Sequence, residues 1–279
     1  MVTKPTKDVV TDPVSADLKK AMRQLKLGRM LDTLPERLVL ARQRHLSHAA
    51  FLELVLADEA TRRDTSSAAR RARSAGLDPA MHLESWDETA AVRYDRTLWA
   101  ELTSLRFLDG PHGALLLGAV GVGKTHLATA LGHIAVRRRI PTLMLRADSI
   151  FKQLKASRLD NSTEAEMRRL AQVQLLIIDD FALQPMDATA TADFYELVVA
   201  RHHKASTVLT SNRDPDEWLA IMSDPLLAQS AVDRLTSTAH ELVIEGPSYR
   251  RRQKGAISLT VFPAVSISRS RLPGIGRRR

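Results

Sequence analysis

The first part of the chain has a helical pattern of apolar positions. In residues 17–75, leucine, methionine, valine and alanine recur every three or four residues, without the alternation that is typical of strands. Pro35 stands where a helix would begin. This segment is therefore predicted to form a small all-helical domain, while residues 1–16, which are polar and carry two prolines, are expected to form a flexible tail.

The pattern changes after residue 112. Short apolar runs alternate there with helix-like stretches of roughly 10–20 residues. Near-continuous apolar strands between helices are typical of a parallel sheet that is covered on both faces. The predicted strands are GALLL (113–117), PTLMLR (141–146), QLLIID (174–179), STVLTS (206–211) and HELVIE (240–245). Residues 112–254 are therefore predicted to form an α/β domain.

Two further segments lack a clear periodic pattern. Residues 76–111 are predicted to be a connecting region, in which Trp86 and Trp99 serve packing rather than ligand binding. Residues 255–279 have no helical period and end in a run of proline, glycine and arginine, so we expect a basic, disordered extension.

Composition narrows the class of protein. No apolar run approaches the roughly 20 residues that span a bilayer, and the first residues lack the apolar stretch of a signal peptide. The chain has no cysteine, which excludes disulfides and thiolate metal sites. We therefore expect a cytoplasmic protein without a membrane partner.

The charge points to a polyanionic partner. The formal net charge is +9, and aromatic residues make up only 4% of the chain, so duplex DNA suits the composition better than base stacking on single strands. One basic run is ambiguous, because it fits a solvated helix face as well as a surface for DNA or another partner. Its members are Arg62, Arg63, Arg70, Arg71 and Arg73.

A phosphate-binding motif follows the first predicted strand. Residues 118–125 read GAVGVGKT and match G-x-x-x-x-G-K-[ST], with a strand before and a helix after. Glycines let successive N–H groups point into one concavity, and the helix N-terminus adds positive potential. Lys124 is expected to hold the β- and γ-phosphates of a nucleoside triphosphate, and Thr125 to bind Mg²⁺. The candidate nucleotide-binding residues are Gly118, Ala119, Val120, Gly121, Val122, Gly123, Lys124, Thr125 and His126.

Two carboxylates end the third predicted strand. Ligands of parallel sheets bind at the carboxyl ends of the strands, so Asp179 and Asp180 are expected beside the phosphate loop. Asp179 would hold Mg²⁺, and Asp180 could orient the attacking water. The alternative is that these residues cap a following helix, since aspartate favours that position.

Three further polar residues are candidates. Asn212 follows the fourth predicted strand and could contact the γ-phosphate or the water, although Ser-Asn-Arg-Asp-Pro also fits a plain turn. Arg234 could form a structural ion pair or reach the γ-phosphate of a neighbouring subunit. Arg250, in the run SYRRRQK (248–254), could sense phosphate within its own subunit.

With these residues identified, the chain resembles AAA+ ATPases of the initiator and helicase-loader group. It is most similar to the IstB-like helper ATPases of bacterial insertion sequences, which are related to the DnaC helicase loader and the DnaA initiator. The matching motifs occur in order in residues 112–254, and two more lie in the helical segment. They are GVGKTHLATALG, LLIIDDF, TSN, DRL and SYR, preceded by LKLGRMLDTLPERL and FLELVLADEATRR.

The resemblance implies a fold and a function. It implies a P-loop three-layer sandwich with sheet order 5-1-4-3-2, Asn212 as the first sensor and Arg234 as a finger that acts on a neighbouring subunit. It also implies an ATP- and Mg²⁺-dependent homo-oligomer that binds and deforms duplex DNA and recruits or stimulates a DDE transposase. Most AAA+ proteins have Asp-Glu where this chain has Asp179 and Asp180, which predicts slow hydrolysis. The chain after SYR is too short for a full helical lid.

Other functions remain open at this stage. A helicase loader of the same fold would prefer single-stranded DNA, and an inert ATP-binding scaffold would use nucleotide only to set its oligomeric state. A GTPase needs an Asn-Lys-x-Asp base reader, but residues 212–215 read Asn-Arg-Asp-Pro. A metabolite kinase would need a small acceptor pocket and a lid, for which the net charge of +9 gives no reason.

Overall fold

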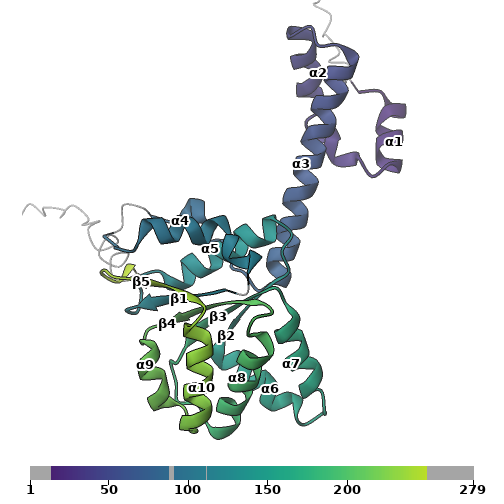
Figure 1. Ribbon diagram of the computed structural model, residues 1–279. Helices are drawn as coiled ribbons and strands as arrows, with labels where there is room; N and C mark the ends of the chain where they lie inside the picture. The colour runs from purple at the N-terminus through teal and green to yellow at the C-terminus, as the bar shows by residue number, and fades with distance from the viewer. Residues whose placement is uncertain (1–13, 88–90, 111, 250–279) are drawn as a thin grey trace, which may run out of the picture.

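The computed structural model describes residues 14–87, 91–110 and 112–249 (Figure 1). Arg250, most of the expected N-terminal tail and the whole of the expected extension 255–279 lie outside the described residues. None of the helices in the described ranges is both long enough and apolar enough to cross a membrane.

A five-stranded parallel sheet forms the centre of the molecule. Its strand order is β2-β3-β4-β1-β5, which is the expected order 5-1-4-3-2 read from the opposite edge, so that prediction is confirmed. The strands are β1 (Gly113–Gly118), β2 (Thr142–Arg146), β3 (Leu175–Phe181), β4 (Ser206–Ser211) and β5 (Ala239–Ile244). Because all neighbours are parallel, the carboxyl ends of the strands lie together along one edge.

Helices cover both faces of the sheet, which confirms the three-layer sandwich. Figure 1 shows one layer above the sheet, α4 (Arg96–Ser104) and α5 (Lys124–Arg137), and a second layer below it. The second layer consists of α6 (Ala147–Ser157), α7 (Thr163–Gln172), α8 (Ala188–Arg201), α9 (Pro215–Trp218) and α10 (Pro225–Thr236). Side chains alternate between the two layers along each strand, which is why the strands are apolar at nearly every position.

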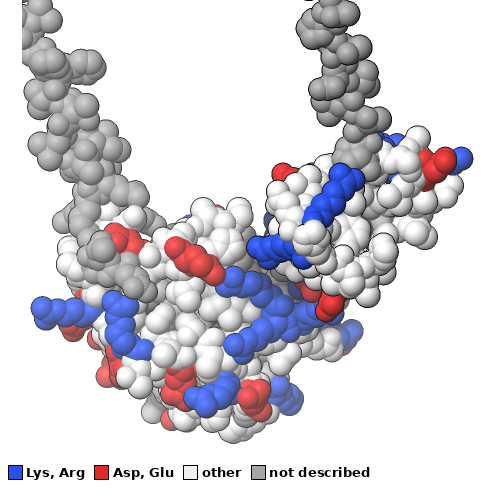
Figure 2. All heavy atoms as spheres, turned by 90° about the horizontal axis from the view of Figure 1, so that it is seen from above, with Lys and Arg blue, Asp and Glu red and all other residues white. Residues whose placement is uncertain are grey.

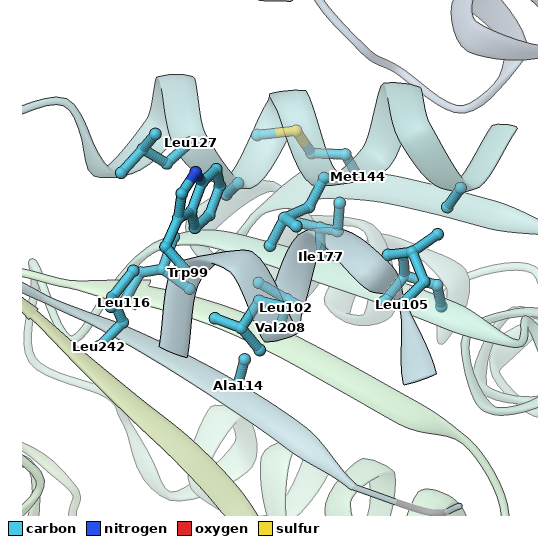
Figure 3. Close-up of a cluster of buried hydrophobic side chains, with 14 of the residues drawn as sticks. Trp99, Leu102, Leu105, Ala114, Leu116, Leu127, Met144, Ile177, Val208 and Leu242 are labelled. Carbon is cyan, nitrogen blue, oxygen red and sulfur yellow. The ribbon is translucent and has the colours of Figure 1, made fainter. Parts of the chain in front are cut away.

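The upper core joins segments that are far apart in the sequence. Figure 3 shows Trp99 and Leu102 of α4 packed near Leu127 of α5 and Leu116 of β1. Trp99 is buried, as expected of a packing residue. The segment 76–111 therefore supplies α4 and several residues on either side of it to the core above the sheet.

The N-terminal helices form a separate small cluster. It consists of α1 (Ala16–Gln24), α2 (Leu34–Gln43) and the first half of α3 (His48–Ser74), with a 3₁₀ turn at Gly28–Asp32. Ser15 and Ser47 cap α1 and α3 by accepting a backbone N–H in the first turn of each helix. The cluster buries Val14, Met22, Met30, Leu34 and Val55.

A single helix connects this cluster to the sheet. α3 has 27 residues, a length of about 40 Å, and it runs from the N-terminal cluster to the upper layer (Figure 1). At its far end Ala72 joins the upper core, and the Arg71 guanidinium donates to the Val136 carbonyl at 3.0 and 3.2 Å. The N-terminal cluster and the α/β fold thus share one continuous helix.

Candidate nucleotide-binding site

The phosphate loop turns between β1 and α5 at the carboxyl edge of the sheet. Gly118 and Gly123 have φ angles of 144° and 107°, a region that favours glycine. A Cβ atom would lie 2.1 Å from the Ile244 carbonyl oxygen at Gly118, and 2.5 Å from the Trp86 indole at Gly123. Both glycines are therefore required by the path of the loop, which ends at the N-terminus of a 14-residue helix. That N-terminus favours a bound anion.

The Lys124 side chain folds back along this loop. It is 5% exposed, and its Nζ donates to the carbonyl oxygens of Gly118 at 2.7 Å and Ala119 at 2.8 Å. A buried ammonium group must be compensated by such contacts. The amine is thus held over the concavity in which phosphate oxygens would replace the loop carbonyls.

Asp179 belongs to a buried hydrogen-bond network. Thr125 donates its hydroxyl to Asp179 Oδ1 at 2.9 Å, and Thr210 donates to the same oxygen at 2.6 Å. The Thr210 hydroxyl in turn accepts the Asp180 backbone N–H at 3.0 Å. Strands β3 and β4 and helix α5 together fix this carboxylate.

The Thr125 hydroxyl and the Asp179 carboxylate together suit a magnesium ion. Mg²⁺ is usually bound by one or two protein oxygens together with substrate phosphates and water. In the described part of the chain, no group of three or more histidine or acidic side chains could hold a metal ion. Thr125 and Asp179 provide a hydroxyl and a carboxylate at the phosphate loop, which suits an ion that arrives with a nucleotide.

A bulge turns Asp180 out of the strand. The register between β3 and β4 shifts between Ile178 and Phe181, and Asp180 has a φ of 54°. Such bulges re-aim side chains beside functional sites. The carboxylate faces Arg146 at the end of β2, with 3.3 Å between Arg146 Nη2 and Asp180 Oδ2. Asp180 does not cap a helix, because α8 begins at Ala188 and is capped by Asp187.

The expected residues meet around one cavity of about 510 Å³. This volume is typical of small-molecule sites. The cavity is lined by Val120, Gly121, Val122, Gly123, Lys124, Thr125, His126, Asp180 and Asn212. The structure thus brings Asp180 and Asn212 together with the phosphate loop. Asp179 does not line the cavity itself but accepts a hydrogen bond from Thr125, which does.

Apolar side chains form another part of the wall. Met81, Trp86, Val92 and Tyr249 line the same cavity, and the Trp86 ring meets the His126 ring edge-on at 5.3 Å between centroids. His126 Nε2 lies 2.9 Å from the His82 carbonyl oxygen, so the ring is tied to the segment before α4. An apolar wall of this kind suits the base of a nucleotide.

Several of these residues were missed by sequence reasoning. Trp86 was assigned to packing, and its segment carries no signal of a binding role. Arg146 had an available signal, because it is the last residue of the predicted strand 141–146, just as Asp179 is the last residue of the predicted strand 174–179. Thr210 lies inside the run STVLTSN, and only the pairing of β3 with β4 shows that it supports Asp179.

Arg234 lies at the amino ends of the strands, opposite the phosphate loop. It stands in the last turn of α10, where a small hollow is lined by Gly113 and Ala239, the first residues of β1 and β5. Its guanidinium donates to the Ser230 carbonyl at 2.8 Å and lies 5.9 Å from the Tyr195 ring centre. A six-residue strand, about 20 Å long, separates this end from the phosphate loop. Arg234 is therefore distant from the cavity of its own chain.

Solved structures share the fold of the α/β region. The structure of DnaI aligns with a TM-score of 0.51 and 21% identity, covering 59% of this chain and 90% of that one. The DnaA initiator from Aquifex aeolicus, solved with AMPPCP, aligns with a TM-score of 0.51 and 21% identity, covering 67% of this chain and 58% of that one. At this identity the likeness shows the fold alone.

Similarity in sequence covers more of this chain than the structural alignments do. A protein of Mycobacterium tuberculosis, described as an ATP-binding protein in an insertion sequence, is 36% identical over 88% of this chain and 97% of its own length. An ATP-binding protein of insertion sequence IS21 from Pseudomonas aeruginosa is 32% identical over 85% of this chain and 90% of its own length. The family model of the IstB-like ATP-binding protein matches residues 20–256. The chain therefore belongs to the family of IstB-like ATP-binding proteins.

Proposed function

We propose that this protein is an ATP-hydrolysing transposition helper that assembles on duplex target DNA and recruits or stimulates a DDE transposase. The observation that carries the proposal is the cavity in which the phosphate loop meets Asp180 and Asn212, in a chain whose relatives belong to insertion sequences. The net charge of +9 supports a DNA partner.

Each side chain has a proposed role in hydrolysis. Lys124 and the loop N–H groups hold the phosphates, while Thr125 and Asp179 hold the metal. Bound Mg²⁺ would supply neutralisation of the phosphate charge. Asp180 orients the attacking water, and Asn212 senses the γ-phosphate; both side chains line the cavity, which supports these roles.

Replacing Asp180 by asparagine should leave ATP binding intact and slow hydrolysis. Loss of a positioned general base typically lowers the rate by about 10²–10⁴-fold. Phosphate release at saturating ATP measures the effect, and nucleotide titration measures the binding. Asp160→Asn, at an exposed turn between α6 and α7, is the matched control. A parental rate in Asp180→Asn would remove this residue from catalysis.

We infer that Arg234 acts on the nucleotide of a neighbouring subunit, because it lies at the amino ends of its own strands, opposite the phosphate loop. Arg234→Ala should bind ATP normally but lose turnover, typically by about 10³–10⁵-fold for an arginine finger. Mixing Arg234→Ala with Lys124→Ala subunits should restore part of the activity, because the second variant supplies the missing arginine. A mixture no more active than either variant alone would contradict action between subunits.

Duplex binding under different nucleotide states tests the function as a whole. Anisotropy of a labelled duplex would be titrated with the protein in ATP, in ADP and without nucleotide, beside a single strand of equal length. Tight duplex binding only in ATP is expected, since the nucleotide would assemble the DNA-binding oligomer. Equal binding in all three states would contradict that assembly, and preference for the single strand would contradict the transposition helper in favour of a helicase loader.

A further inference from the structure

A basic groove lies where α3 meets the end of α5. Its volume is about 440 Å³, and its walls come from segments that are more than sixty residues apart in the sequence. Figure 2 shows Lys and Arg side chains gathered on this face beside the base of the N-terminal helices. The lining polar side chains are Ser67, Arg70, Arg71, Ser74, Arg139 and Thr142.

The arginine run of α3 divides into two kinds of residue. Arg62 and Arg63 both bind the carboxylate of Glu59 through their Nε atoms at 2.7 Å. Glu59 is only 4% exposed, and these two guanidinium groups lower its pKa to about 2. Arg71 is occupied as well, because it donates to the Val136 carbonyl and to the Ser67 hydroxyl at 2.6 Å. All three arginines are therefore occupied: Arg62 within α3, Arg63 also by the Lys26 carbonyl, and Arg71 by α5.

Arg70 and Arg73 make no contacts of this kind in the described part of the chain. They lie one turn apart on α3 and are exposed, and within the described ranges neither has an ion pair or a hydrogen-bonding partner for its side chain. Across the groove, Arg139 pairs with Asp64 at 2.8 Å, but both side chains are about 70% exposed. An ion pair so exposed contributes little and exchanges readily for another anion. Arg70 and Arg139 line the groove, and Arg73 lies beside it, one turn along α3 from Arg70. Three guanidinium groups are thus available in or next to one concave surface.

We propose that this groove binds the phosphate backbone of duplex DNA, with Arg70 and Arg73 as direct contacts and Arg139 exchanging Asp64 for phosphate. The inference rests on the proposed function and assigns its DNA contact to a surface. Arginine and hydroxyl side chains are typical backbone contacts. The anchors of protein interfaces are enriched in tryptophan and tyrosine. No aromatic side chain lines this groove among the described residues, and its apolar lining is limited to Ala75, Val136, Ile140 and Pro141.

The test measures duplex affinity at several salt concentrations, with full-length protein in ATP. The double variant Arg70→Ala/Arg73→Ala should bind a labelled duplex of about 30 base pairs roughly tenfold more weakly, whatever its sequence. Its slope of log K against log salt should fall by about 1.8, because each phosphate contact contributes about 0.9. Arg70→Lys/Arg73→Lys, which keeps both charges, should bind nearly as the parent does.

Arg168→Ala is the matched control, since Arg168 is an exposed arginine on α7, below the sheet. It should keep the parental affinity and slope. Thermal unfolding and ATP affinity should be unchanged in all variants, because none of these side chains touches the nucleotide cavity. If the double alanine variant kept the parental affinity and slope, the assignment of DNA binding to this groove would be wrong, although duplex binding itself would stand. A parent that binds no duplex would overturn the proposed function itself.

Discussion

Replacing Lys124 by alanine is expected to weaken ATP binding by at least about 100-fold. The ammonium group is buried and held over the phosphate loop by the carbonyl oxygens of Gly118 and Ala119. In that position it would meet the β- and γ-phosphates, where charge-assisted hydrogen bonds are strong because water is excluded. Titration with a fluorescent ATP analogue measures the loss.

A control separates this effect from a general loss of charge. Lys152→Ala removes an exposed lysine of α6 that pairs with Asp148 and does not line the nucleotide cavity. It should bind ATP as the parent does. Thermal unfolding must show that Lys124→Ala is folded, since the substitution also frees two loop carbonyls. Normal ATP affinity in folded Lys124→Ala would refute the assignment of the loop.

The largest expected effect on stability comes from Arg201, at the end of α8. The side chain is 3% exposed, and its guanidinium donates to a ring of backbone carbonyls and one hydroxyl. These partners are the carbonyl oxygens of Leu170, Ala171, Val173 and Ser206 and the Thr207 hydroxyl. The Arg201 guanidinium group therefore caps the C-terminal end of α7 and joins it to β4.

Arg201→Leu should lower the free energy of unfolding by about 3–5 kcal/mol. The leucine fills part of the space, but several buried carbonyls lose their donor, and each unsatisfied group costs about 1–3 kcal/mol before relaxation. Burial lowers the pKa of Arg201 to about 10, so the group is still charged at neutral pH. Urea unfolding at pH 7 measures the change.

Two variants sharpen this result. Arg201→Lys keeps the charge but loses the planar fork, so its stability should lie between those of the parent and the leucine variant. Arg168→Ala, at an exposed position on α7, should change stability by less than about 0.5 kcal/mol. A leucine variant as stable as the parent would show that the carbonyls find other donors or water.

Much of the fold could be predicted because its signals are local. Each strand is a short apolar run, since both faces of a parallel sheet are buried, and Leu116 and Leu115 of β1 indeed enter opposite layers. The segment 76–111 carried weaker signals. Leu102 and Trp99 pack against the sheet and α5, and only those distant partners show that α4 belongs to the core.

The chain by itself determined the phosphate loop and the strands, whereas the sheet order followed from the resemblance of its motifs to a known family. Glycine spacing encodes a backbone path, and a short continuous apolar run encodes a strand buried on both faces, so both can be read locally. Tertiary structure decided what depends on distant segments. It placed Trp86 and Arg146 at the cavity, joined Thr210 to Asp179 by a hydrogen bond, and put Arg234 at the amino ends of the strands, away from the phosphate loop. Packing against α5 also occupies Arg71 through the Val136 carbonyl, whereas Glu59 pairs with Arg62 and Arg63 within α3 itself.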